Sequence, residues 1–243
     1  MVEVFSREAP GASMFTAQCQ VLDMKPVLSD IPCIKNEQLT LWQADRDAWR
    51  RDHPLMAMLA DGLALVPVLD DRLATATTDG QSLFFNAAYS AGLNATTRAF
   101  LQAHLVWHCV AGHLHEKPHL DGHRWHLACD HEVNALLMLQ GFPVCEDTVL
   151  FPSRMKQSAN DVYDWLSGHP ALEREVSLDQ LPCLPLASSS LPNAWQRATD
   201  PDYRPQPLNE QVESGWQHQA IQAAHHCQTP LDSSGSLPGF LIT

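Results

Sequence analysis

The sequence has 243 residues and a mass of 27.0 kDa, a size that suits one large domain or two small ones. Hydrophobic residues make up 45% of the chain and charged residues 18%, as in folded globular proteins, which excludes a disordered chain. The formal net charge is −13, and so negative a surface repels nucleic-acid phosphates and anionic lipids. No apolar run approaches the roughly 20 residues that a membrane-spanning helix needs.

The start of the chain and the cysteines predict a cellular location. The first segment has no basic stretch followed by an apolar core, so we expect no secretory signal. The seven cysteines stand alone in the sequence, without a CxxC pair. Together these features predict a reduced, cytoplasmic protein.

The first third of the chain predicts two helices and a small sheet. We expect residues 1–35 to form a loosely structured lead-in and residues 36–243 to form the domain proper. Apolar spacing predicts a helix over 36–51, and a second, short helix follows over 53–60 with a proline in its first turn. A β-branched run, a Thr-rich piece and an Asp-Gly turn predict a small antiparallel sheet over 63–86.

The remainder predicts four more helices and one irregular segment. Apolar spacing and helix-ending glycines predict helices over 96–112, 125–140, 158–168 and 209–227. Residues 181–208 are rich in proline and serine, which predicts a linker or an extended wrap. Helices around a small sheet, without βαβ repetition, indicate an α+β fold.

Histidine is the unusual residue in this chain. Eight of the thirteen histidines lie between positions 104 and 131. His104 and His108 are four residues apart in a predicted helix, so their rings lie about 40° apart around its axis and about 6 Å apart along it. That geometry lets two imidazoles chelate one metal ion, as in the HExxH helix of zinc hydrolases. The flanking residues are apolar, and burying polar rings there is costly unless they find partners.

Two residues compete as a third ligand. His113 would point away from His104 in an unbroken helix, so it qualifies only if Gly112 breaks the helix. Asp130 lies on a mostly apolar face of the 125–140 helix, where a carboxylate needs a cation or hydrogen-bond donors. Asn134, one turn further on, would orient Asp130 or a ligand histidine. A plain hydrogen bond between Asp130 and Asn134 is the alternative.

Four further histidines flank the polar loop between these two helices. We expect them to be exposed, with a secondary metal contact as the alternative; they are His115, His119, His123 and His126.

The histidine segments resemble a known family. AHLVWHCVAGH at 103–113, followed by RWHLACDHEVN at 124–134, is similar to the metallopeptidase-like domain that precedes a von Willebrand A-like domain in some bacterial proteins. The family pattern reads AHExxHxxxGH and then WNxAxDxxxN. Supporting pieces lie at 53–54, 77–80, 161–166, 216–224 and 235–238, so the resemblance covers residues 40 to 241. It implies a zincin-like fold and a Zn²⁺ site at His104 and His108, with His113 or Asp130 as the third ligand.

The chain departs from that pattern in two ways. Leu105 stands where the family has the HExxH glutamate, and a leucine cannot serve as the general base. Losing a general base typically lowers the rate by about 10²–10⁴, and the candidate replacements are Glu132, Glu116 and His131. The chain also ends where the von Willebrand A-like domain would begin, so that domain's adhesion-type metal site is not expected here.

Three hypotheses follow. The first is a zinc-binding, zincin-like binding or scaffold module with weakened or lost peptidase activity and no catalytic residue assigned. By resemblance, its partners would be a MoxR-type AAA ATPase, a separate von Willebrand A-like protein or a peptide. The second is an active zinc hydrolase with another base, a peptidase rather than an endoribonuclease, because the net charge disfavours RNA. The third is a structural protein whose histidines satisfy one another without metal.

Overall fold

In the computed structural model of the protein, residues 31–115, 117–145, 148–169, 177–180 and 199–227 are described. Most of the expected lead-in over residues 1–35 and most of the proline-rich segment therefore lie outside the described residues.

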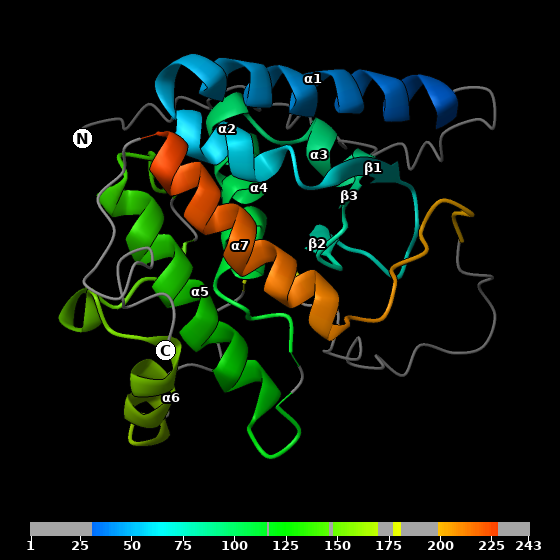
Figure 1. The fold of residues 1–243 in the computed structure, drawn as a ribbon. Coiled ribbons are helices and arrows are strands. Elements are labelled where there is room, and N and C mark those ends of the chain that lie inside the picture. Colours follow the sequence, from blue (N-terminus) through cyan, green and yellow to red (C-terminus); the bar gives the residue numbers. More distant parts are fainter. Residues whose placement is uncertain (1–30, 116, 146–147, 170–176, 181–198, 228–243) are drawn as a thin grey trace, which may run out of the picture.

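The described residues form helices around a small sheet (Figure 1). The helices are α1 (Ile31–Asp52), α2 (Pro54–Ala60), α3 (Ala87–Ala91), α4 (Ala95–Val110), α5 (Gly122–Leu139), α6 (Ala159–Ser167) and α7 (Glu210–His226), with a 3₁₀ turn at Pro152–Arg154. The strands are β1 (Ala64–Val68), β2 (Ala76–Thr78) and β3 (Ser82–Asn86). The predicted α+β class is confirmed. The first helix begins at Ile31, so residues 31–35 are helical, whereas we expected them to belong to a loosely structured lead-in.

The sheet corrects one expectation. The strand order is β1-β3-β2, with β2 antiparallel to β3 but β1 parallel to β3, so the sheet is mixed rather than antiparallel. The Asp-Gly turn joins β2 to β3 as predicted, with Gly80 at φ 83° and Asp79 accepting the backbone N–H of Ser82. Strand β3 lies in the centre of the sheet, and its residues Leu83–Phe85 are buried.

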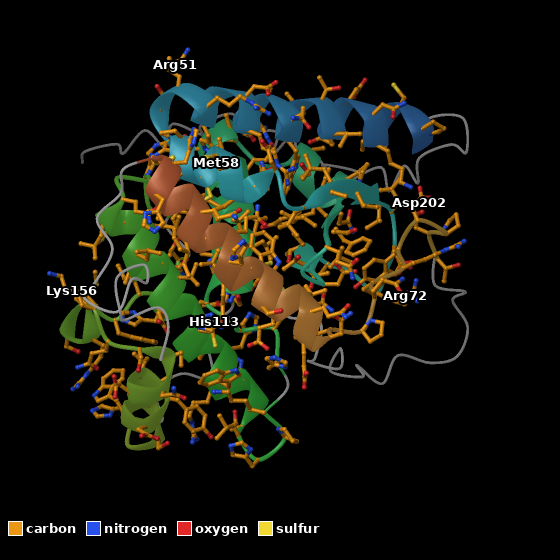
Figure 2. The ribbon with its side chains drawn as sticks, in the orientation of Figure 1. Arg51, Met58, Arg72, His113, Lys156 and Asp202 are labelled. Carbon is orange, nitrogen blue, oxygen red and sulfur yellow. The ribbon has the colours of Figure 1, made fainter. Side chains whose placement is uncertain are left out.

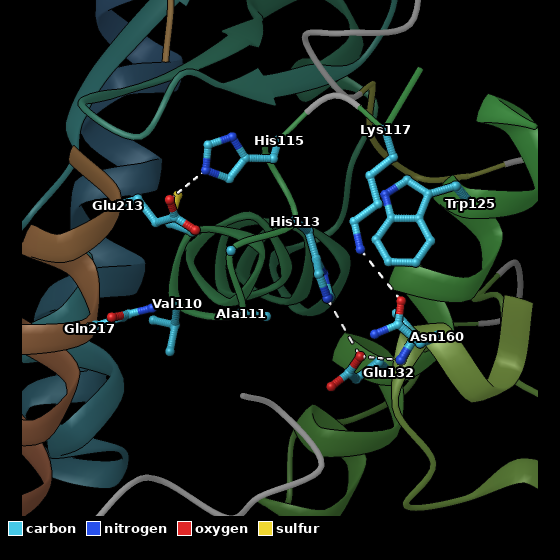
Figure 3. Close-up of a pocket in the computed structure, with 13 residues that line it drawn as sticks. Val110, Ala111, His113, His115, Lys117, Trp125, Glu132, Asn160, Glu213 and Gln217 are labelled. Carbon is cyan, nitrogen blue, oxygen red and sulfur yellow. Dashed lines mark hydrogen bonds and ion pairs between the residues drawn. The ribbon is translucent and has the colours of Figure 1, made fainter. Parts of the chain in front are cut away.

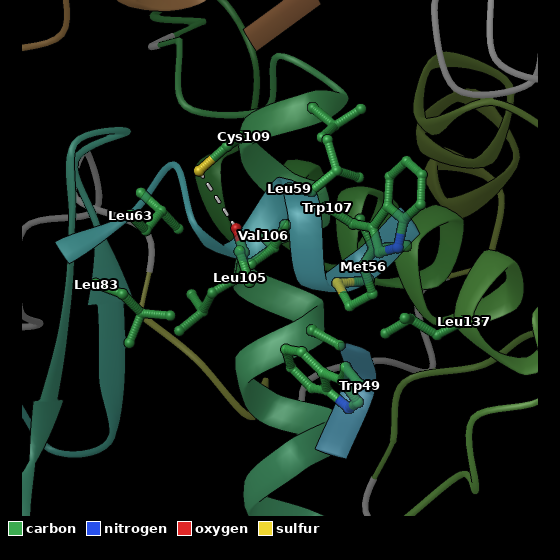
Figure 4. Close-up of a cluster of buried hydrophobic side chains, with 14 of the residues drawn as sticks. Trp49, Met56, Leu59, Leu63, Leu83, Leu105, Val106, Trp107, Cys109 and Leu137 are labelled. Carbon is green, nitrogen blue, oxygen red and sulfur yellow. Dashed lines mark hydrogen bonds between the residues drawn. The ribbon is translucent and has the colours of Figure 1, made fainter. Parts of the chain in front are cut away.

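Helix α4 lies at the centre of the molecule. It packs against β2 on one side, α5 on another and α7 on a third (Figure 1). Asn94 caps its first turn by accepting the backbone N–H of Thr97, and every residue from Phe100 to Val110 is buried. Figure 4 shows Leu105 on the side of α4 that faces Leu63 and Leu83. The apolar surroundings of the histidine pair are therefore the main hydrophobic core.

A second, smaller core joins α5 to α6. Trp125 and Leu127 on α5 pack with Val162 and Leu166 on α6. Helix α6 begins with a capping box between Ser158 and Asp161, which fixes where its N-terminus points.

His113 is a buried residue, and Figure 2 labels it together with side chains at the edges of the view. Arg51, Arg72 and Lys156 lie at the edges of the molecule, whereas His113 lies well inside its outline and is 5% exposed. Among the described residues, no helix is both long enough and apolar enough to cross a membrane.

The stacking of Phe85 on Trp42 ties the sheet to α1, with ring centroids 4.1 Å apart and both side chains fully buried. We expect Phe85→Ala to lower the free energy of unfolding by about 3–5 kcal/mol in urea denaturation. Leu139→Ala is the control, because that side chain is 49% exposed and its loss should cost no more than about 0.5 kcal/mol. Equal losses in the two variants would contradict the assigned core.

Candidate metal centre

Helix α4 presents two imidazoles to one point. His104 and His108 are fully buried, and their Nε2 atoms are 2.9 Å apart. The predicted spacing of one helical turn therefore brings the two rings together, and both do so through the same nitrogen.

Helix α5 adds a carboxylate. Asp121 caps α5 by accepting the backbone N–H of Arg124, and the helix then carries Asp130 into the space beside the two rings. Asp130 is 1% exposed, and its Oδ1 lies 3.6 Å from Nε2 of His104 and 3.4 Å from Nε2 of His108.

A second carboxylate comes from the segment 177–180. Asp179 Oδ1 lies 3.6 Å from Nε2 of His104, and Asp179 Oδ2 lies 4.0 Å from Nε2 of His108. One ligand atom from each of His104, His108, Asp130 and Asp179 lies within 4.8 Å of the others. In a tetrahedral site with metal–ligand bonds of about 2.0–2.1 Å, neighbouring ligand atoms lie about 3.3 Å apart, so the observed spacings approach that geometry.

The donor set fits a divalent cation. Asp130 Oδ1 and Asp179 Oδ2 are buried and have no hydrogen-bond partner among the described residues. Buried polar atoms are nearly always satisfied, and a buried carboxylate needs a cation or donors. Both unpaired oxygens face Nε2 of His108, so a cation placed among the four groups would satisfy them together.

The tautomer of His104 also suits metal binding. Asn134 donates its amide N–H to the Val149 carbonyl, at 3.0 Å, so its Oδ1 faces His104 Nδ1, at 2.7 Å. An amide oxygen only accepts, so His104 carries a proton on Nδ1 and directs Nε2 into the cluster. Asn134 therefore orients a histidine, which was one of the two roles expected for it.

The pKa values reflect burial and the two carboxylates. Burial and the neighbouring His104 lower the pKa of His108 to about 4, so that ring is neutral. Burial would lower the pKa of His104 too, but Asp179 and Asp130 raise it above its ordinary value. In the metal-free protein, a proton therefore competes for the His104 position that a metal would take.

His126 lies beside this cluster and is buried instead of exposed, which corrects the prediction for that residue. It is 5% exposed, and its Nε2 lies 2.7 Å from Asp179 Oδ1 and 3.3 Å from Asp130 Oδ1. Burial would lower its pKa, but the two carboxylates raise it to about 9. The Ser177 hydroxyl contacts Asp130 Oδ2 and Asp179 Oδ1, so segment 177–180 is tied to α5.

His113 takes a different place. Gly112 adopts φ 70° and ends α4, and the chain folds back so that the His113 N–H donates to the His108 carbonyl. Its ring nitrogen Nδ1 then lies 3.1 Å from Nδ1 of His108, on the side of that ring remote from the cluster. Gly112 does break the helix, but this leaves His113 outside the group of four, so we take Asp130 into the proposed ligand set instead.

The candidate replacement bases also lie elsewhere. Glu132 accepts the backbone N–H of Ala159, and His131 bridges the Phe151 N–H and the Arg154 carbonyl. Glu116 lies outside the described residues. Of the two carboxylates in the cluster, Asp179 has its unpaired oxygen farther from His108 Nε2, at 4.0 Å against 3.4 Å for Asp130.

A cavity of about 240 Å³, drawn in Figure 3, is lined in part by His113, which contacts His108. His113 and Glu132 line it, together with Lys117, whose Nζ lies 4.0 Å from the ring centroid of Trp125. None of the four clustered residues lines this cavity.

Comparison with known proteins identifies a family for this chain. A family model described as "Putative metallopeptidase domain" matches residues 41–177, which is more than half of the chain. The chain belongs to this family. No curated protein and no solved structure matches it. The stretch matched to the metallopeptidase family contains His104, His108 and Asp130, whereas Asp179 lies just beyond it.

Sequence reasoning missed His126 as a buried residue and Asp179 altogether. His126 precedes Asp130 by four residues, so the helical period predicts that both lie on the same face of α5. Asp179 has no such signal, because a segment remote in sequence brings it to the cluster.

His126 is the cationic partner of two buried carboxylates, so its removal should destabilise the metal-free protein. We expect His126→Leu to lower the free energy of unfolding by about 3–5 kcal/mol in chelator-treated protein, since the charges lose their partner. His123→Leu is the control on the same helix, where the histidine is exposed and the change should be small. An unchanged urea midpoint in His126→Leu would contradict this account.

Proposed function

We propose that the chain binds one zinc ion through His104, His108, Asp130 and Asp179, and acts as a zincin-like binding or scaffold module with weakened or lost peptide hydrolysis. The convergence of four buried ligand atoms carries this proposal. Imidazole nitrogens and carboxylate oxygens are a donor set that suits zinc. When bound, zinc would supply a positive charge that offsets the two carboxylates and polarises oxygen donors.

Two observations support weakened hydrolysis. Zinc sites with four protein ligands are typically structural, whereas catalytic sites keep one position open, and here four protein groups converge. In addition, Leu105 is fully buried in the main core and cannot accept a proton. The general-base contribution of the HExxH glutamate, about 10²–10⁴ in rate, is therefore missing.

An active hydrolase is the second candidate, and one observation favours it. Asp179 Oδ2 has no hydrogen-bond partner among the described residues and lies 4.0 Å from His108 Nε2, the longest of these contacts. With His104, His108 and Asp130 as the ligands, Asp179 Oδ2 would be free to accept a proton from an attacking water. Asp179 would then take the role that Leu105 cannot perform.

The resemblance also supports a partner. We propose that the bound ligand is a protein or peptide, supplied by a MoxR-type ATPase or a separate von Willebrand A-like protein, and that the chain works in the cytoplasm. The negative charge of the chain supports a protein partner over nucleic acid.

Metal content tests the zinc proposal directly. We expect untagged protein to copurify with about one zinc per chain by elemental mass spectrometry, and His104→Ala to lose it. Zinc at 100 times its dissociation constant should stabilise the fold by about 2.7 kcal/mol, so a chelator should lower the melting temperature. His123→Ala, on the exposed side of α5, should retain the metal. Metal-free wild-type protein with an unchanged melting temperature after zinc addition would refute the proposal.

The variant Asp179→Asn separates the two functions. If Asp179 is a ligand of a closed site, we expect no metal-dependent cleavage of a general peptide substrate by the wild type and weaker zinc binding in the variant. If Asp179 is the base, the wild type should cleave, and the variant should keep zinc but lose about 10²–10⁴ in kcat. Zinc content and peptidase rate, measured on the same preparations, decide between these outcomes.

A further inference from the structure

His108 has a proton-accepting neighbour on its outer side. Its Nδ1 lies 3.1 Å from Nδ1 of His113, and two ring nitrogens at that distance share one proton. If His108 binds zinc through Nε2, as in the proposed function on which this inference rests, its own proton lies on Nδ1. His108 then donates to His113, and His113 keeps its proton on Nε2.

A carboxylate lies on the far side of His113 from His108. Nε2 of His113 lies 3.5 Å from Oε2 of Glu132, and an ionised carboxylate only accepts. Glu132 is itself held by the backbone N–H of Ala159, the first residue of α6. Glu132 therefore favours a proton on Nε2 of His113, which leaves Nδ1 of His113 to accept from His108 and the Nε2 lone pair of His108 directed at the cluster.

The two α4 histidines are thus oriented by different means. His104 donates to the amide of Asn134, which is 1% exposed and held by a backbone carbonyl. His108 donates to His113, which packs edge-on against Trp125 and, with Glu132, lines the 240 Å³ cavity (Figure 3). One orienting group is sealed in the core, and the other borders a space that a ligand could enter.

We propose that His113 and Glu132 are positioning residues of the metal centre, which fix the tautomer and direction of His108 from the cavity side. Partners of this kind typically change metal affinity about 10–100-fold when they are removed. His113 acts through its acceptor nitrogen, so a different side chain that keeps an acceptor in that place should serve.

The experiment compares two substitutions of the same residue. We expect His113→Leu to weaken zinc binding about 10–100-fold in competition with a chromophoric chelator, and Glu132→Leu to weaken it in the same direction. His113→Gln keeps an oxygen acceptor and should restore affinity close to that of the wild type. With Co²⁺ as the probe, His113→Gln should also keep the visible absorption of the wild type, because no ligand changes.

Urea unfolding of the metal-free variants controls for loss of the fold. His131→Leu is a matched control, since it removes a buried histidine whose two nitrogens bond to the backbone instead of to the cluster. It should lower stability and leave zinc affinity unchanged. If His131→Leu does not fold, His113→Gln against His113→Leu still decides the matter.

The outcomes separate this inference from the proposed function. Wild-type protein that binds no zinc refutes the proposed function and this inference with it. Tight binding in the wild type with unchanged affinity in His113→Leu overturns only this inference. If His113→Gln loses as much zinc affinity and Co²⁺ absorption as His108→Ala, then His113 is a ligand and the positioning role is wrong.

Discussion

The burial of two carboxylates beside two imidazoles is the constraint on which this structure depends. Asp130 and Asp179 bring negative charge into a space where the four side chains are at most 1% exposed. The imidazolium of His126 offsets part of that charge, yet one oxygen of each carboxylate still lacks a hydrogen-bond partner among the described residues. An uncompensated buried charge is costly, so the cluster favours a cation.

The surrounding elements hold the four groups in place. Helix α4 supplies both rings at a spacing fixed by the helical turn, and its burial in the main core leaves the rings little freedom. Asn134 holds one ring from α5, and His113 contacts the other from the turn after α4. Three of the four groups of the candidate metal centre therefore lie on the helices α4 and α5, Asp179 comes from the segment 177–180, and the glycine that ends α4 brings in His113.

Leu105 links the family comparison to the proposed function. In a metallopeptidase helix the residue after the first histidine supplies the base, whereas in this chain it packs toward Leu63 and Leu83 (Figure 4). The same helix therefore carries both the candidate chelating pair and an apolar contact with the sheet side of the core. Asp179, which lies beyond the matched residues, adds a carboxylate that the family match does not include.

The sequence by itself predicted six of the seven described helices, the α+β class and the pairing of His104 with His108, whereas it missed α3 and left Asp130 and His113 as alternatives for the third ligand. Helical period, caps and glycines are local features, and so is the one-turn spacing of His104 and His108. The parallel pairing of β1 with β3 was decided only in the folded chain, because it joins two strands that are not consecutive in sequence. The same holds for Asp179, which reaches the cluster from a segment remote in sequence, and for His113, which reaches the outer side of His108 across a sharp turn. Contacts of both kinds exist only once the helices have packed.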